Sequence, residues 1–258
     1  MIESLNSPHV ARVKALIGSR GVKERKSTGQ FVAEGMQCAR EALVAQSGPQ
    51  IETLYLTTNG RIKVEEIADL AQFNVVDVSD EVMKEMSETI TPQGILAICT
   101  IPTTDLKSIL LNGSRKFIYL SEVQDPGNAG TILRSADAFA MDAVITSPGS
   151  VDMYSPKVVR ATAGSLWHVP LFTGITLAQL SEQLPMVKKI ALSAQGSKSL
   201  LDVKDLSDVV AIFGNEARGI DALIGSDVMQ VSIPMTGNAE SLNLAAAAAI
   251  VIFHLSHN

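Results

Sequence analysis

The chain has 258 residues and a formal net charge of −6, and 46% of its residues are hydrophobic. This composition is that of an ordinary globular protein with ample capacity for a buried core, and it excludes a low-complexity chain. Because the sequence shows neither a signal-peptide pattern nor an apolar run of membrane length, we expect a cytoplasmic protein with no membrane partner.

The first hundred residues alternate between predicted helices and strands, which is typical of a compact α/β module. Ser7 and Pro8 have the residue types of an N-cap and a first turn, and Gly18 closes this amphipathic helix. A basic loop is expected at 20–29. The later elements are expected as a strand at 30–35, a helix at 36–46, a strand at 51–58, a helix near 63–73, and strands at 74–80 and 94–101.

A linker is expected at 101–113, so we predict two domains, 1–103 and 104–258. The second half again alternates between strands and helices, which indicates a largely parallel sheet covered on both faces. Ser155 and Pro156 are expected to cap the second of its helices. Its strands are expected at 116–123, 143–148, 168–172, 188–195, 209–215 and 228–235. Its helices are expected at 131–140, 157–164, near 176–184 and at 244–255.

Positive charge is concentrated near the start of the chain. Residues 1–30 carry six Lys or Arg against two Glu, a net +4, so the remaining residues sum to −10. Affinity for phosphate follows local charge, so a basic segment on an acidic body suggests phosphate contact. A solvated helix and loop would explain the same charges. The six basic residues are Arg12, Lys14, Arg20, Lys23, Arg25 and Lys26.

Several familiar site patterns are absent from the sequence. No G-x-G-x-x-G opens a helix, the run around Lys198 does not match a P-loop, and no G-x-S-x-G elbow occurs. Cys38 and Cys99 lie in apolar runs, and the four histidines have no ligand spacing, so we expect buried thiols and no metal.

Three predicted strands each end in a polar loop, at 124–130, 214–219 and 234–243. Open α/β sheets build ligand sites from such loops at the carboxyl ends of their strands. Asn128 lies where a strand gives way to a helix, and Arg134 follows within the first turn or so, where the two could bind an anion. The last predicted helix is apolar all round, which places it in a core or an interface.

Each candidate residue also has an ordinary structural explanation. Asn128 and Arg134 could be a capped helix start with a surface arginine. Glu216 could be a solvated loop residue or a carboxylate that contacts a ligand. Ser241 and Asn243 could cap the last helix or present their side chains to the site.

Taken together, the loops resemble the three motifs of the SpoU/TrmH family of RNA 2′-O-ribose methyltransferases, members of the SPOUT superfamily. The first motif is SEVQDPGNAGTILRSADAFAMDAV, the second comprises RATAGSLWHVPLF and IFGNEARGI, and the third is VSIPMTGNAESLNLAAAAAIVIFHL. The resemblance spans about 117–255, and one departure is Met141, where the family usually has glycine. The N-terminal part resembles the ribosomal-protein-L30-like (L30e-like) α/β/α substrate-binding domain of many such enzymes.

The resemblance implies S-adenosylmethionine as methyl donor and no metal. It also implies a SPOUT domain with a mostly parallel sheet, a deep trefoil knot at its C-terminus, and a homodimer formed through the knot region. The positions that match donor-holding backbone are Gly214, Ile233 and Leu242. The positions that match the methyl-acceptor site are Asn128, Arg134, Glu216, Ser241 and Asn243.

The expected reaction needs an in-line approach of a ribose oxygen to a sulfonium methyl group, so positioning supplies on the order of 7–11 kcal/mol. An arginine is a poor base because its guanidinium stays charged. We therefore hypothesise that Arg134 stabilises the emerging alkoxide, with one subunit's donor near Arg134 of the partner subunit. An RNA-docking surface is expected at Lys14, Lys23, Arg25, Lys26 and Arg160.

The predicted function is therefore a dimeric RNA 2′-O-methyltransferase, with rRNA favoured over tRNA as substrate. The alternatives are a tRNA enzyme, a non-catalytic RNA-binding protein that keeps the fold, methylation of a base, and a nucleotide-binding metabolic enzyme. The last lacks its phosphate motifs and leaves the basic segment unexplained.

Overall fold

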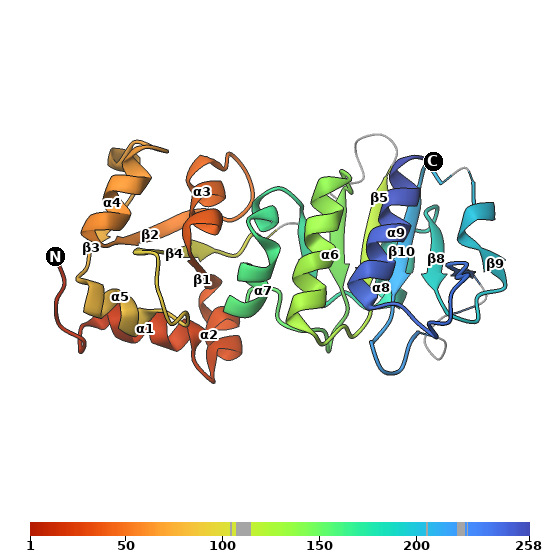
Figure 1. The fold of residues 1–258 in the computed structure, drawn as a ribbon, viewed down its shortest axis with the longest axis horizontal. Coiled ribbons are helices and arrows are strands. Elements are labelled where there is room, and N and C mark those ends of the chain that lie inside the picture. The colour runs from red at the N-terminus through yellow and green to blue at the C-terminus, as the bar shows by residue number, and fades with distance from the viewer. Residues whose placement is uncertain (104, 107–114, 205, 221–224, 226) are drawn as a thin grey trace. The chain divides into compact units, whose positions relative to one another are not determined.

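The computed structural model describes residues 1–103, 105–106, 115–204, 206–220, 225 and 227–258 (Figure 1). The chain forms two compact units. Unit 1 contains Met1–Thr103 and Asp152–His168, and unit 2 contains Thr104–Val151 and Val169–Asn258. The predicted division at residue 103 assigns 152–168 to the second domain, whereas these residues pack within unit 1. Most of the predicted linker lies outside the described residues.

Unit 1 is built on a four-stranded mixed sheet in the order β1-β4-β2-β3. β4 runs antiparallel to both β1 and β2, and β3 is parallel to β2. The strands are β1 (Gln30–Glu34), β2 (Ile51–Leu56), β3 (Val75–Asp77) and β4 (Ile95–Thr100), all at predicted positions. The helices are α1 (Pro8–Ile17), α2 (Gly21–Thr28), α3 (Met36–Val44), α4 (Thr58–Glu65), α5 (Asp80–Met86) and α7 (Pro156–Thr162), with 3₁₀ turns η1 (Leu70–Gln72) and η3 (Ser165–Trp167).

The basic segment 20–29 is a helix, α2, so the predicted loop is wrong. The sequence gives little helical signal because only Gly21 and Arg25 of α2 are buried, and no apolar stripe exists to predict the helix. Arg20 at the N-cap position makes no side-chain capping bond. Helix α5 was also not predicted, although Ser79 caps it by accepting a hydrogen bond from the backbone of Val82.

Two sets of contacts hold unit 1 together. Apolar residues of α1 and α5, among them Val13 and Met83, pack into one buried cluster with Tyr55 and Leu96 of the sheet. The segment 152–168 supplies the second set, because α7 packs against β1 and two of the segment's aromatic rings contact Phe31. These rings are Tyr154 and Trp167, with centroids 5.1 Å and 6.1 Å from that of Phe31.

Unit 2 is built on a seven-stranded parallel sheet in the order β7-β6-β5-β10-β8-β11-β9. This confirms the predicted α/β class with a mostly parallel sheet. The strands are β5 (Lys116–Leu120), β6 (Ala143–Thr146), β7 (Leu171–Thr173), β8 (Lys188–Leu192), β9 (Lys198–Ser199), β10 (Val209–Phe213) and β11 (Val228–Ser232). The helices are α6 (Pro126–Ala138), α8 (Leu177–Gln183) and α9 (Leu244–Ser256), with the 3₁₀ turn η4 (Leu200–Asp202).

The helices of unit 2 pack onto a sheet whose central strand, β10, is buried along its whole length. Leu180 of α8 packs in one buried cluster with Phe117 and Tyr119 of β5 and with Val210 of the neighbouring β10. Phe117 and Tyr119 are alternate residues, so they face the same side of the sheet. Helices α6 and α9 lie side by side and contact each other (Figure 1). Met141, the departure from the family pattern, is buried, and the turn before it places Ala140 at φ +51°. No helix among the described residues is long and apolar enough to span a bilayer.

Candidate active site

A cavity of about 660 Å³ opens at the carboxyl ends of the central strands of unit 2. Residues that follow β5, β8, β10 and β11 line it, and so does the first turn of α9. The three predicted polar loops therefore meet at one site, because parallel strands end at the same edge of a sheet. The wall combines apolar side chains, such as Leu192, Ile233 and Leu242, with polar ones from the loops.

A chain of three side chains links the loops. The Nδ2 of Asn128 donates to Oε1 of Glu216 over 3.1 Å, and the Nδ2 of Asn243 donates to Oδ1 of Asn128 over 3.1 Å. Glu216 also accepts hydrogen bonds from the backbone N–H groups of Gln124 and Asp125, each over 3.2 Å. Both ends of the Asn128 amide are occupied, which fixes its orientation between the other two loops.

The same residues start the two helices that border the cavity. Asp125 caps α6 by accepting a hydrogen bond from the backbone N–H of Asn128 over 2.7 Å. Asn243 caps α9, since its Oδ1 accepts from the backbone N–H groups of Ala245 and Ala246. Asn243 therefore caps α9, as one of the two predicted alternatives has it, and the same side chain also lines the cavity.

Glu216 is held as a carboxylate. Burial alone raises the pKa of Glu216, but hydrogen bonds from its own backbone, from Asn128 and from the backbone of Gln124 and Asp125 outweigh burial and lower the pKa below its usual value. A carboxylate with a lowered pKa is a poor proton acceptor. Its position instead supports an orienting role for Glu216.

The glycine at the start of the second loop allows a close backbone contact. A Cβ on Gly214 would lie 2.5 Å from the carbonyl atoms of Gly219, so no other residue fits without a shift of the loop. Gly219 itself has φ +66°, in the left-handed region that favours glycine. The two glycines of GNEARG thus form a tight loop that turns Glu216 toward Asn128.

The predicted site residues separate into two groups. Those that line the cavity are Asn128, Gly214, Glu216, Ile233, Ser241, Leu242 and Asn243. Arg134 is absent from the described lining residues and lies exposed on α6.

The sequence prediction missed part of the wall. The missed residues include Ser193 and Ala194, which follow β8, and Glu240 of the third loop. A strand at 188–195 was predicted. Because parallel strands end at the same edge of a sheet, its carboxyl end could have been expected at the site. Asn215 was also missed, and its Nδ2 donates to the carbonyl of Glu122 over 2.8 Å. Glu122 has φ +53° and pairs with Arg218, which ties the first loop to the second.

The predicted RNA-docking residues of unit 1 differ in their environments. Lys23 and Lys26 are exposed on α2. Lys14 is paired with Glu85, and Arg160 pairs with Glu34 and Glu88. The fifth residue, Arg25, is buried.

Arg25 does not belong to an exposed docking surface, which corrects that prediction. Only 5% of its side chain is exposed, and its Nη2 lies 2.7 Å from Oδ2 of Asp152. Its Nη1 also donates to the carbonyl of Leu16. A guanidinium can be buried here because a carboxylate and a carbonyl satisfy its donors.

Within the described part of the chain, no group of three or more His, Cys, Asp or Glu residues is arranged so that it could hold a metal ion. Cys38 and Cys99 are free and buried, as the sequence predicts, and burial raises the pKa of the Cys38 thiol to about 11.

Comparison with known proteins identifies the family. The model of the SpoU rRNA Methylase family matches residues 115–253, and that of the MRM3-like substrate binding domain matches residues 8–97. The chain belongs to the SpoU rRNA methylase family, which confirms the resemblance stated from the sequence. The two matched ranges lie on either side of residue 103.

Individual relatives cover nearly the whole chain. The 23S rRNA (guanosine(2553)-2'-O)-methyltransferase RlmP of Bacillus subtilis is 33% identical over 236 residues, 90% of this chain and 91% of its own. A 23S rRNA (uridine(2479)-2'-O)-methyltransferase of Streptomyces viridochromogenes is 25% identical and covers 93% of this chain and 86% of its own. An AdoMet-bound rRNA methyltransferase from Sinorhizobium meliloti superposes with a TM-score of 0.87 at 28% identity, covering 99% and 97% of the two chains.

Proposed function

We propose that this chain transfers a methyl group from S-adenosylmethionine to a ribose 2′-hydroxyl of rRNA. The observation that carries the proposal is the Glu216–Asn128–Asn243 chain of hydrogen bonds around one cavity at the carboxyl edge of the sheet. Relatives named as 23S rRNA 2'-O-methyltransferases and a similar AdoMet-bound structure support the same conclusion.

The cavity fits the methyl donor by size and by chemistry. Its volume is typical of small-molecule sites, and apolar side chains of Ile233 and Leu242 offer a surface for an adenine ring. The backbone of Gly214 and its neighbours offers hydrogen-bonding groups where a Cβ would block approach. S-adenosylmethionine supplies an electrophilic methyl group on a sulfonium. No metal takes part in this proposal.

The acceptor side is formed by the polar residues of the three loops. Asn128, fixed from both sides, and the exposed Ser241 offer hydrogen-bonding groups that orient a ribose. Glu216 holds Asn128, and Asn243 holds both Asn128 and the start of α9. Transfer would break the bond between the sulfonium sulfur and the methyl group, form the bond from that methyl group to the ribose oxygen, and release the hydroxyl proton to solvent water. Arg134 would stabilise the negative charge that develops on the ribose oxygen and contact the adjacent phosphate, since a guanidinium does not accept protons at neutral pH.

Arg134 is exposed and does not line the cavity of its own chain, so its proposed role requires a homodimer. Helix α9 exposes an apolar stripe, because Ile250 is 42% and Phe253 52% exposed, and Phe253 packs edge-on against Phe139, which follows α6. A second copy of the chain covers this stripe, and Arg134 of the partner subunit completes the acceptor site. The α6–α9 surface is therefore proposed as the subunit interface.

Two finer features of the fold belong to the same proposal. Strand β11 lies beyond β8, and α9 packs back against β10 and α6, which supports the proposal of a C-terminal trefoil knot. The substrate-binding domain is proposed to be L30e-like and to contact rRNA.

Two buried free thiols fit a reducing compartment, so we place the enzyme in the cytoplasm.

The central test measures donor binding and methyl transfer separately. Calorimetry with S-adenosylmethionine should show binding, and transfer from tritium-labelled donor should modify rRNA at ribose positions found by mass-spectrometric mapping. Donor binding without transfer to any RNA would favour a non-catalytic RNA-binding protein. Methyl groups found on bases would contradict ribose methylation, and methylation of tRNA alone would contradict rRNA as substrate.

The role of Arg134 has its own variant. Arg134→Lys keeps a positive charge but loses the planar guanidinium, so we expect transfer to fall with donor binding intact. Near wild-type transfer would show that neither the guanidinium geometry nor a base at this position is required.

A further inference from the structure

The basic residues of unit 1 fall into paired and unpaired groups. Lys14, Arg25 and Arg160 have acidic partners, and so do Arg12 with Glu52 and Arg61 with Asp77. Within the described chain no ion pair is found for Arg20, Lys23 or Lys26, and the same holds for four other exposed cations of unit 1, Arg40, Lys63, Lys84 and Lys157. The sequence prediction included Lys23 and Lys26 but not Arg20.

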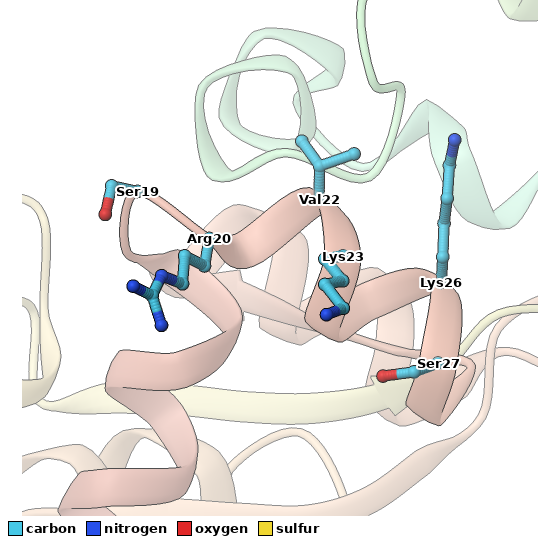
Figure 2. Close-up of a pocket in the computed structure, with 6 residues that line it drawn as sticks. All are labelled: Ser19, Arg20, Val22, Lys23, Lys26 and Ser27. Atoms are coloured by element: carbon cyan, nitrogen blue, oxygen red, sulfur yellow. The ribbon is translucent and has the colours of Figure 1, made fainter.

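What distinguishes Arg20, Lys23 and Lys26 is that they line one surface hollow at α2. Figure 2 shows them with Ser19, Val22 and Ser27, and together these six residues line a depression of about 620 Å³. Arg20, Lys23 and Lys26 are three residues apart, so they lie along about two turns of the helix, and Figure 2 shows the side chain of Lys26 extending away from those of Arg20 and Lys23. No carboxylate is among the described lining residues, and every charged group there is a hydrogen-bond donor.

The hollow rests on a fixed helix. Arg25 of the same helix is buried and is held by Asp152 and by the carbonyl of Leu16. A Cβ on Gly21 would lie 2.5 Å from that carbonyl oxygen, so α2 crosses the end of α1 at close range. The lysines and arginine therefore start from an anchored backbone, which lowers the entropy lost when they bind a ligand.

We infer that the α2 patch, defined as Arg20, Lys23 and Lys26, binds the phosphodiester backbone of the substrate RNA. This inference rests on the proposed RNA substrate and assigns a phosphate-docking site to unit 1, separate from the donor cavity of unit 2. Because the whole chain carries a net charge of −6, binding of a polyanion depends on local cations such as these. Contacts to the backbone position RNA without reading its sequence.

The test compares two variants of equal charge. The patch variant Arg20→Gln/Lys23→Gln/Lys26→Gln and the control variant Arg40→Gln/Lys63→Gln/Lys84→Gln each remove three exposed cations from unit 1. Fluorescence anisotropy with a labelled RNA hairpin suffices, since phosphate contacts do not depend on sequence. The slope of log affinity against log salt should fall in magnitude by roughly 2–3 in the patch variant and stay near the wild-type value in the control.

A variant that keeps the positive charges tests whether the loss of RNA binding comes from the lost charge or from a change in folding. Lys23→Arg/Lys26→Arg should bind the hairpin as the wild type does, and all variants should bind S-adenosylmethionine equally. An unchanged slope in the patch variant, an equal loss in the control, or binding of the protein to phosphatidylglycerol vesicles but not to the hairpin would overturn the inference. A wild type that binds RNA through the patch but methylates none would instead contradict the proposed function.

Discussion

Asn128 is the residue on which the three loops of the site converge. Its side chain receives a hydrogen bond from Asn243 and donates one to Glu216, and its backbone N–H is bound by Asp125. Any change that rotates this amide disconnects two loops at once. The polar residue types and their place after strands could be predicted from the sequence, but the pairing could not, because it joins residues about 90 to 115 positions apart.

Asn243 allows its two roles to be separated. Asn243→Asp keeps an oxygen that caps α9 and adds a negative charge at the helix N-terminus, but it loses the donor to Asn128. We expect its free energy of unfolding to stay within about 0.5 kcal/mol of the wild type while methyl transfer falls. Asn243→Ala should lower both, with a stability loss of about 1 kcal/mol. Urea unfolding and a transfer assay check both; equal stability of the two variants would contradict the cap.

Glu216 gives the site a dependence on acidity. The folded-state pKa of Glu216 is lowered, so the Glu216 carboxylate stabilises the folded protein. Its contribution to the free energy of unfolding is complete above the unfolded-state pKa and is lost as the pH falls through the folded-state pKa. Glu216→Gln should therefore be less stable than the wild type at neutral pH, by about 1 kcal/mol for this exposed side chain. The difference should shrink in urea unfolding below about pH 4. A difference independent of pH would contradict the hydrogen-bonded carboxylate.

Helix α6 shows how a sequence can place a motif correctly and still misplace the start of an element. The run DPGNAG reads as a loop because it contains proline and two glycines, yet Asp125 is an N-cap and Pro126 a first-turn residue. The helix therefore begins five residues before the predicted start, and Asn128 lies in its first turn. Helix α2 was missed for a different reason, because its anchor is a buried charge, Arg25, and apolar patterns carry no signal for such an anchor.

Helix α9 carries the test of the proposed dimer. Phe253→Asp places a charge in the exposed apolar stripe, so we expect sedimentation to show a shift from dimer to monomer, with transfer lost and donor binding reduced at most slightly. Met186→Asp is a matched control, because Met186 is 89% exposed outside this stripe. A monomeric wild type, or a dimer that Phe253→Asp leaves intact, would contradict the proposed interface.

Unit 1 is assembled from two separate stretches of the chain, and this organisation was not predicted. The resemblance to a family divides the sequence by motif, and RATAGSLWHVPLF belongs to the second motif although its first nine residues lie in unit 1. Contacts between Phe31 and two rings beyond residue 150 leave no local signal in the sequence. Only the packing of the whole molecule reveals them.

The buried pair between Arg25 and Asp152 tests this organisation. Asp152→Ala leaves an uncompensated charge inside unit 1, so we expect the free energy of unfolding to fall by about 3–5 kcal/mol, measured by urea unfolding. The double variant Arg25→Met/Asp152→Ala should recover part of this loss, because no charge is then buried without a partner. A loss below about 1 kcal/mol for Asp152→Ala would show that the pair does not hold the segment.

The split of unit 1 also sets an order of events on the ribosome. Residues 1–103 leave the exit tunnel without α7 and without the carboxylate that Arg25 needs. At about 5–20 residues per second, synthesis from residue 104 to residue 168 adds roughly 3–13 s before these partners arrive. The first unit to be translated is thus not free to finish folding first, and nascent β1 waits with one side of Phe31 uncovered until the middle of the second unit has been made.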